Sequence, residues 1–243
     1  MTDELVDLKW RRRGDVAVLK LNNPKVNSLS RTLREQFLEK LAVVRHSLPK
    51  LLVITGEGKG FSAGAHLPEL AEVLKQGESA TRQWLKEGHE FINLIASLPC
   101  TKIALIHCFA MAGGLELALA CDTRIAVGEV KISLPEAKIK ILPGWQGTIR
   151  TKKIMGEKAA EEFYQSGKEL SVEEAMNFGL IDRSFADFSA AWNFITELSA
   201  ERDSVSYADS AEEIENFIRK ATPAQGEFVS PAITAIENFL RKP

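Results

Sequence analysis

The chain has 243 residues, of which 45% are hydrophobic and 26% are charged, and its formal net charge is −2. This composition is typical of a globular protein with a buried core, and the charge argues against a dedicated nucleic-acid binder, which would carry a strongly basic face. The first residues, MTDELVDLKW, have no apolar stretch behind a basic start, and no segment reaches the ~18 apolar residues of a membrane span, so we expect neither a signal peptide nor a membrane partner.

The first part of the chain predicts paired strands, a helix and a buried strand. Residues 5–10 alternate between apolar and polar side chains, and residues 16–21 are apolar and β-branched. Ser30 precedes a helix whose apolar residues recur every three or four positions from Leu33 to Val44. Residues 51–55 then form a short apolar strand that leads into a glycine-rich loop.

The rest of the chain continues to alternate before it becomes mainly helical. The pattern predicts helices at 82–96 and 113–121, strands at 102–106 and 122–127, a short apolar piece at 180–182, and terminal helices at 190–200, 211–220 and 232–241. Strands that alternate with helices indicate βαβ units and a largely parallel sheet that is buried on both faces.

Two loops that follow predicted strands, residues 60–66 and 110–116, consist mainly of small residues. Small residues allow a ligand to approach the backbone closely, and the second loop opens a helix, whose first N–H groups have no intrahelical partner. One N–H from each loop could hold a carbonyl oxygen as negative charge develops on it. Glycine-rich turns after strands more often serve tight packing, so neither loop alone establishes a site.

Two glutamates strengthen the case for chemistry. Glu116 is the only charged residue in an otherwise apolar helix, and an unpaired buried charge is costly, so it is paired, protonated or functional. Glu136 follows Pro135 in a turn. Structural interpretations remain open for both, as a first-turn acid that satisfies backbone donors for Glu116 and as a surface acid for Glu136.

Six motifs in order resemble the signatures of the crotonase (enoyl-CoA hydratase/isomerase) family. They are NNPKVNSLS at 22–30, GFSAGA at 60–65, CFAMAGGLELALACD at 108–122, LPEA at 134–137, LPGWQGT at 142–148 and GKELSVEEAMNFGLID at 167–182. The resemblance implies an α/β fold, with a crotonase-type β-spiral core of ββα units in residues 1–185 that carries the active site. Residues 186–243 would form a C-terminal helical trimerisation region, within the same domain or as a small subdomain.

The resemblance also implies roles for four residues. The backbone N–H groups of Ala65 and Gly113 would form an oxyanion hole for a thioester carbonyl. Glu116 would activate water, and Glu136 would exchange the proton at the α-carbon. Because both carboxylates are present, we expect hydration of a 2-enoyl-CoA to a 3-hydroxyacyl-CoA. The alternatives are an enoyl-CoA isomerase, a decarboxylating crotonase, or a non-catalytic binding subunit with this fold.

Further residues are expected to bind the substrate, either acyl-CoA or a thioester of a related pantetheine carrier. By the same resemblance they are Lys25, Val26, Ala63, His66, Leu67, Trp145, Phe239 and Lys242. No cofactor and no metal are expected. The partners implied are the acyl-CoA substrate and further copies of the chain, in a homotrimer or a dimer of trimers.

Three positions depart from the family pattern. His66 replaces the usual Asp, either as a loop-capping exchange or as an extra titrating group, since histidine titrates near neutrality. Trp145 replaces a small residue, and its indole either narrows the pocket or points into the helical wall. Ala112 replaces the first of three glycines, and we expect one methyl group there to matter little.

The remaining cysteines and histidines suggest no catalytic role. Cys100, Cys108 and Cys121 lack disulfide or zinc-site spacing and lie in apolar surroundings, so we expect buried, reduced thiols and a cytoplasmic location. His89 has charged neighbours on its helix and is expected to be solvated, whereas His107 ends a buried strand and is expected to be a core residue.

Overall fold

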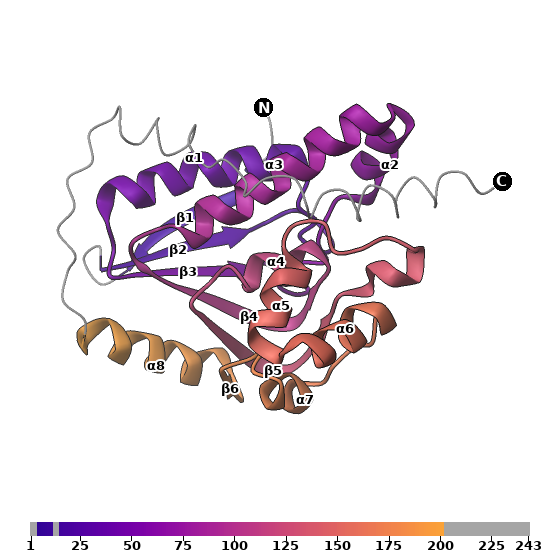
Figure 1. The fold of residues 1–243 in the computed structure, drawn as a ribbon. Helices are drawn as coiled ribbons and strands as arrows, with labels where there is room; N and C mark the ends of the chain where they lie inside the picture. The colour runs from indigo at the N-terminus through magenta and orange to yellow at the C-terminus, as the bar shows by residue number, and fades with distance from the viewer. Residues whose placement is uncertain (1–3, 12–14, 202–243) are drawn as a thin grey trace.

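The computed structural model describes residues 4–11 and 15–201, and Figure 1 shows their arrangement. The strands are β1 (Val6–Arg11), β2 (Val16–Leu21), β3 (Leu51–Gly56), β4 (Thr101–Met111), β5 (Thr123–Ser133) and β6 (Arg183–Phe185). They form one sheet in chain order, in which β1 pairs with β2 antiparallel and the later pairs are parallel. The predicted α/β class with a largely parallel sheet is therefore confirmed.

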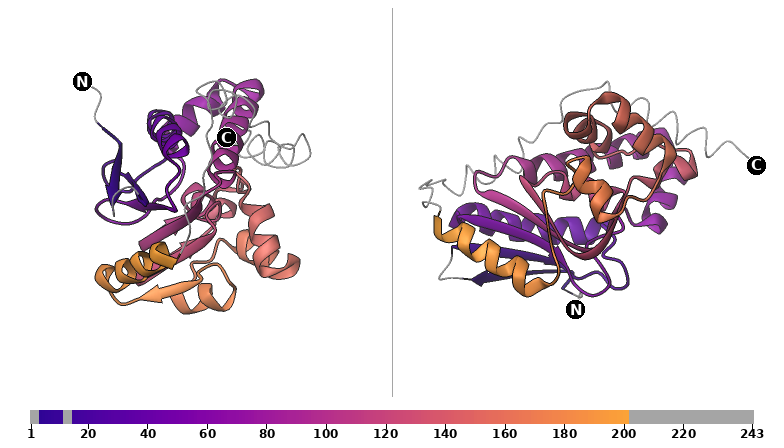
Figure 2. Two further views of the ribbon diagram at one scale, coloured as in Figure 1. Left: turned by 90° about the vertical axis from the view of Figure 1, so that its left-hand side faces the viewer. Right: turned by 90° about the horizontal axis from the view of Figure 1, so that it is seen from below.

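Helices cover both faces of this sheet. They are α1 (Arg31–Ser47), α2 (Leu67–Lys75), α3 (Glu78–Ala96), α4 (Gly113–Ala118), the 3-10 helix η2 (Pro135–Ile139), α5 (Gly147–Met155), α6 (Glu157–Ser166), α7 (Val172–Asn177) and α8 (Phe188–Glu201). In Figure 2, α1 and α3 lie on one side of the sheet and α8 on the other. Residues after Glu201, including two of the predicted helices, Phe239 and Lys242, lie outside the described residues.

The apolar strands fill two separate cores because successive side chains point to opposite faces. In β3 every residue is buried. Leu52 and Ile54 join the large core on the side of α1 and α3, whereas Leu51 and Val53 join a smaller cluster that α8 completes. This two-sided burial explains why β3 reads as a continuous apolar run rather than as an alternating one.

The strands β4 and β5 run five or six residues beyond their predicted ends, which were residues 106 and 127. Their register shifts between His107 and Cys108, where Cys108 has a φ of 52°. Such a bulge bends a strand and redirects its side chains, so Cys108 is exposed, and the prediction that it is buried was wrong. The bent ends of the two strands form further isolated β-bridges, between Ser62 and Ala110 and between Ile132 and Leu170.

Three other elements differ from what the sequence indicated. The pattern did not indicate α2, a helix of nine residues with a proline in its first turn. The helix expected from residue 82 begins at Glu78, and the short apolar piece at 180–182 directly precedes β6, for which no strand was predicted. No helix in the described part of the chain is long and apolar enough to cross a membrane.

Ala112 joins β4 to α4 in a strained conformation, with φ 50° and ψ −132°. A side chain at positive φ costs about 1–3 kcal/mol, so the methyl group that Ala112 adds lowers stability here. We expect Ala112→Gly to raise the free energy of unfolding by about 1 kcal/mol, since the relief of strain exceeds the entropy that glycine adds to the unfolded chain. Urea denaturation measures this change.

Ala110→Gly is the matched control, because Ala110 is buried two residues earlier within β4. Glycine inside a strand lowers stability. A loss of stability in both variants would show that Ala112 is not strained.

Candidate active site

The loop at residues 60–66 is fixed by hydrogen bonds to Asn27, in the segment at residues 22–30, and by hydrogen bonds of its own Ser62. Asn27 Nδ2 donates hydrogen bonds to the carbonyl oxygens of Glu57 and Gly60, each at 2.9 Å. Ser62 Oγ donates to the Asn27 carbonyl at 2.7 Å and accepts from the Gly64 N–H at 3.1 Å. These buried contacts hold the backbone around Ala65 in one conformation.

Two backbone N–H groups meet where this loop faces the start of α4. A Cβ atom built on Gly113 would lie 3.4 Å from the Ala65 nitrogen, so the two residues are immediate neighbours. Neither N–H donates a hydrogen bond to another backbone group within the described residues. Two adjacent free donors from separate loops are the arrangement that an oxyanion requires.

Glu116 projects from the first turn of α4 and is buried. Its Oε1 accepts hydrogen bonds from the backbone N–H groups of Trp145 at 2.8 Å and Gly147 at 2.6 Å. Gly147 allows this approach, because a Cβ atom there would lie 2.9 Å from Oε1. Burial raises the pKa of Glu116 to about 7, although the two N–H donors and Arg150 favour the ionised form.

Glu136 lies in η2 and is also buried, so its interpretation as a surface acid was wrong. Its Oε2 has no hydrogen-bond partner within the described residues. Burial raises its pKa well above the ordinary value, and the nearby Glu116 raises it further. The two carboxyl groups therefore differ: two N–H donors oppose the effect of burial on the pKa of Glu116, whereas the charge of Glu116 adds to that effect on the pKa of Glu136.

A cavity of about 610 Å³ joins these groups. Ten of the twelve predicted site residues line it: Lys25, Val26, Ala63, Ala65, His66, Leu67, Gly113, Glu116, Glu136 and Trp145. The other two, Phe239 and Lys242, lie outside the described residues. No group of three or more His, Cys, Asp or Glu side chains is placed to hold a metal ion in the part of the chain that the structure describes.

Two histidines near the cavity differ from the predictions made for them. His66 takes the N-cap position of α2 but makes no capping hydrogen bond, so nothing supports a loop-capping role. His89 is buried rather than solvated. Burial lowers its pKa, while a hydrogen bond with the Gly144 backbone opposes this effect. His89 therefore contacts the loop that supplies the donors to Glu116.

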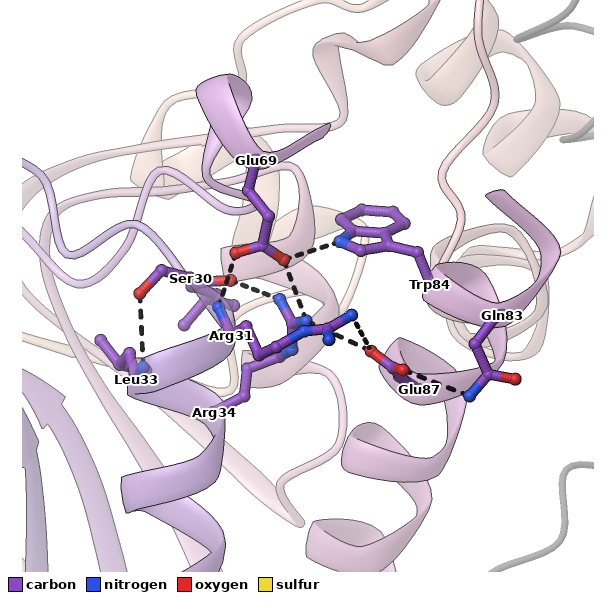
Figure 3. Close-up of polar contacts among 9 residues, drawn as sticks. Ser30, Arg31, Leu33, Arg34, Glu69, Gln83, Trp84 and Glu87 are labelled. Carbon is purple, nitrogen blue, oxygen red and sulfur yellow. Dashed lines mark hydrogen bonds and ion pairs between the residues drawn. The ribbon is translucent and has the colours of Figure 1, made fainter. Parts of the chain in front are cut away.

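A group of residues beside the cavity, which Figure 3 shows, was not expected from the sequence. Trp84 lines the cavity and donates its indole N–H to Glu69 at 2.9 Å. The buried Arg34 forms an ion pair with the same carboxylate at 3.1 Å. One signal could have revealed Arg34, because it lies on the apolar stripe of α1, three residues before Phe37.

Comparisons with known proteins agree with this fold. A family model described as enoyl-CoA hydratase/isomerase matches residues 11–223. A probable enoyl-CoA hydratase of Bacillus subtilis is 37% identical over 167 residues, which are 68% of this chain and 64% of that protein. The isomerase/hydratase fer4 of Mycosarcoma maydis is 37% identical over 175 residues, with 68% of this chain and 63% of that protein covered. The chain thus spans slightly less than two thirds of these relatives.

A crystal structure of an enoyl-CoA hydratase from Thermoplasma volcanium superposes with a TM-score of 0.73 at 28% identity and covers 99% of this chain and 98% of that one. The chain has the crotonase fold. It belongs to the enoyl-CoA hydratase/isomerase family, as the motifs implied.

The raised pKa of Glu116 predicts a pH-dependent stability. Since the fold favours the protonated acid, this group stabilises the protein fully below its ordinary pKa of 4.5, and the contribution is lost as pH rises through about 7. Glu116→Gln keeps both N–H contacts and cannot ionise. As pH rises from about 4.5 to 8, the free energy of unfolding of the wild type should therefore fall by about 3 kcal/mol relative to that of Glu116→Gln.

Urea denaturation at several pH values between about 4.5 and 8 measures this change. Glu129→Gln, at an exposed position on β5, is the control and should show no such trend. A pH-independent difference between wild type and Glu116→Gln would contradict the burial of an ionisable Glu116.

Proposed function

We propose that the protein hydrates a 2-enoyl thioester to the 3-hydroxyacyl thioester. One observation carries this proposal: two buried carboxyl groups, of which only Glu116 accepts hydrogen bonds from two backbone N–H groups, line the same cavity as the adjacent N–H groups of Ala65 and Gly113. Addition of water to a conjugated thioester needs a base for the water, an acid for the α-carbon and donors for the enolate oxygen.

In this mechanism the thioester carbonyl oxygen accepts hydrogen bonds from the N–H groups of Ala65 and Gly113. Ionised Glu116 takes a proton from water as the water oxygen bonds to the β-carbon, and the electron pair of the double bond moves toward the carbonyl oxygen. Glu136 then gives its proton to the α-carbon. Transfer of a proton from Glu116 to Glu136 restores the enzyme.

The carrier is proposed to be coenzyme A or a related pantetheine. Lys25 is exposed at the cavity and suits a phosphate group, and Val26 and Leu67 are exposed apolar residues beside it. We keep Phe239 and Lys242 as proposed contacts of the nucleotide. A homotrimer or dimer of trimers, a cytoplasmic location and catalysis without a cofactor complete the proposal.

Isomerisation of an enoyl thioester is the second candidate. Trp145 packs against Gly113, with ring carbons 3.0 Å from the position of a Cβ atom there, and its bulk beside Glu116 favours a reaction that adds no water. The relative from Mycosarcoma maydis also bears both activities in its name. An isomerase would move a proton between the α- and γ-carbons through Glu136 alone.

The test of hydration is the loss of conjugated-enoyl absorbance when purified protein is mixed with crotonyl-CoA. We expect wild-type protein to show rapid loss, and Glu136→Gln and Glu116→Gln each to lower kcat by about 10²–10⁴-fold, since each removes one proton-transfer step. Glu129→Gln serves as the control for a glutamate outside the cavity.

If folded wild-type protein causes no loss of absorbance with any 2-enoyl-CoA, the hydratase proposal is wrong. Turnover of a 3-enoyl-CoA that survives Glu116→Gln but not Glu136→Gln would establish the isomerase instead. Binding of no acyl-CoA at all would favour a non-catalytic role.

A further inference from the structure

Two tryptophans form an aromatic wall on the α3 side of the cavity. We use this name for Trp84 and Trp145, whose ring centroids lie 4.8 Å apart with an interplanar angle of 40°. Both residues line the cavity, yet Trp84 is only 5% exposed and Trp145 only 1%. The wall is therefore packed from behind and cannot yield into empty space.

Two charged residues, Arg34 and Glu69, contact the aromatic wall and hold its rings in position. Arg34 lies over the rings, with its guanidinium carbon 5.2 Å from the Trp145 centroid and 5.9 Å from that of Trp84. It also donates to the Leu29 carbonyl at 2.7 Å and pairs with Glu69. Figure 3 shows Glu69 between Arg34 and the indole N–H of Trp84, to which it is hydrogen-bonded. Displacing either ring would break stacking and hydrogen bonds around a buried charge.

Trp145 fills the space between α3 and the paired N–H groups. A Cβ atom on Gly88 would lie 1.8 Å from the indole nitrogen, and one on Gly113 would lie 3.0 Å from the opposite edge of the ring. Glycine is thus required on the α3 side for this ring to fit. The indole N–H has no hydrogen-bond partner within the described residues. The volume of the ring, rather than a polar contact, is what it contributes.

The wall also lies next to the proposed reaction centre. The backbone N–H of Trp145 donates to Glu116, so the first ring atom lies three bonds from the nitrogen that positions the base. A substrate whose carbonyl oxygen lies at Ala65 and Gly113, and whose β-carbon faces Glu116, must direct its next carbons past this residue. Because the buried ring fills the space between Gly113 and Gly88, these carbons cannot extend through that space.

We propose that the aromatic wall restricts the enzyme to short acyl thioesters and that Trp145 sets the limit. This inference rests on the proposed hydration and names its substrate class. Arg34 and Glu69 are positioning residues, since they act on the acyl chain only through the two indoles. Where a pocket has no room for added methylenes, discrimination reaches about 10–200-fold for a single group.

The experiment compares kcat/KM for crotonyl-CoA and trans-2-decenoyl-CoA in wild-type protein and in Trp145→Ala. Wild-type protein should favour the short substrate by at least about 100-fold, and the variant should narrow this ratio by at least about tenfold. The ratio within one protein cancels any loss of catalysis common to both substrates. The substitution keeps the backbone N–H that binds Glu116. Trp145→Phe is the matched control and should retain most of the preference.

Affinity supplies a readout that does not depend on turnover. Calorimetry with butyryl-CoA and decanoyl-CoA should show that Trp145→Ala binds the long ligand about tenfold more tightly than wild type does, with the short ligand changed little. If Trp145→Ala does not fold, Trp84→Leu tests the same wall.

An unchanged substrate ratio and unchanged affinity for decanoyl-CoA in a folded variant would overturn the inference and leave hydration intact. Equal kcat/KM values of the wild type for crotonyl-CoA and trans-2-decenoyl-CoA would also overturn the inference and leave hydration intact. Wild-type protein that hydrates neither substrate would instead refute the proposed function, and the affinities would still decide whether the wall limits chain length.

Discussion

The site depends on burying two carboxyl groups close together in an apolar cavity. Desolvation disfavours both charges, and each charge disfavours the other. The two groups are hydrogen-bonded differently. Two backbone N–H groups donate to Oε1 of Glu116, whereas Oε2 of Glu136 has no hydrogen-bond partner within the described residues. Ionisation is therefore favoured at Glu116 and disfavoured at Glu136. A base and an acid of the same residue type thus arise from burial, mutual repulsion and unequal hydrogen bonding.

The fold serves this arrangement by bringing four distant loops to one place. The bent end of β4 leads into α4 and so places Glu116, and the parallel end of β5 leads into η2 and places Glu136. The buried Asn27 ties two further loops together beside them. The strain at Ala112 belongs to the same turn. Stability is thus lost at several points around the cavity, and the two apolar cores on either side of the sheet must offset that loss.

The sequence predicted those parts of the molecule whose cause is local. Continuous apolar runs located β2 and β3, and Glu116 was recognised because it is the only charge in an apolar helix. Features that depend on distant partners were not predictable: Glu69 lies 35 residues from Arg34 and 15 from Trp84, and no local pattern links them. His89 looked solvated because its sequence neighbours are charged, yet it is buried against Gly144 on another element. The bulge at Cys108 was missed because residues 107–111 do not alternate as an ideal strand does.

Residue 145 combines two functions that are chemically independent. Its backbone N–H supports Glu116, and any residue except proline can supply that donor. Its side chain shapes the cavity wall and can change without altering the donor. Substrate size can therefore vary at this position while the acid and base remain unchanged. The limit on such variation lies in Gly88, since a residue with a Cβ atom there would exclude the indole, and in Arg34, whose buried charge needs the aromatic faces and Glu69 around it.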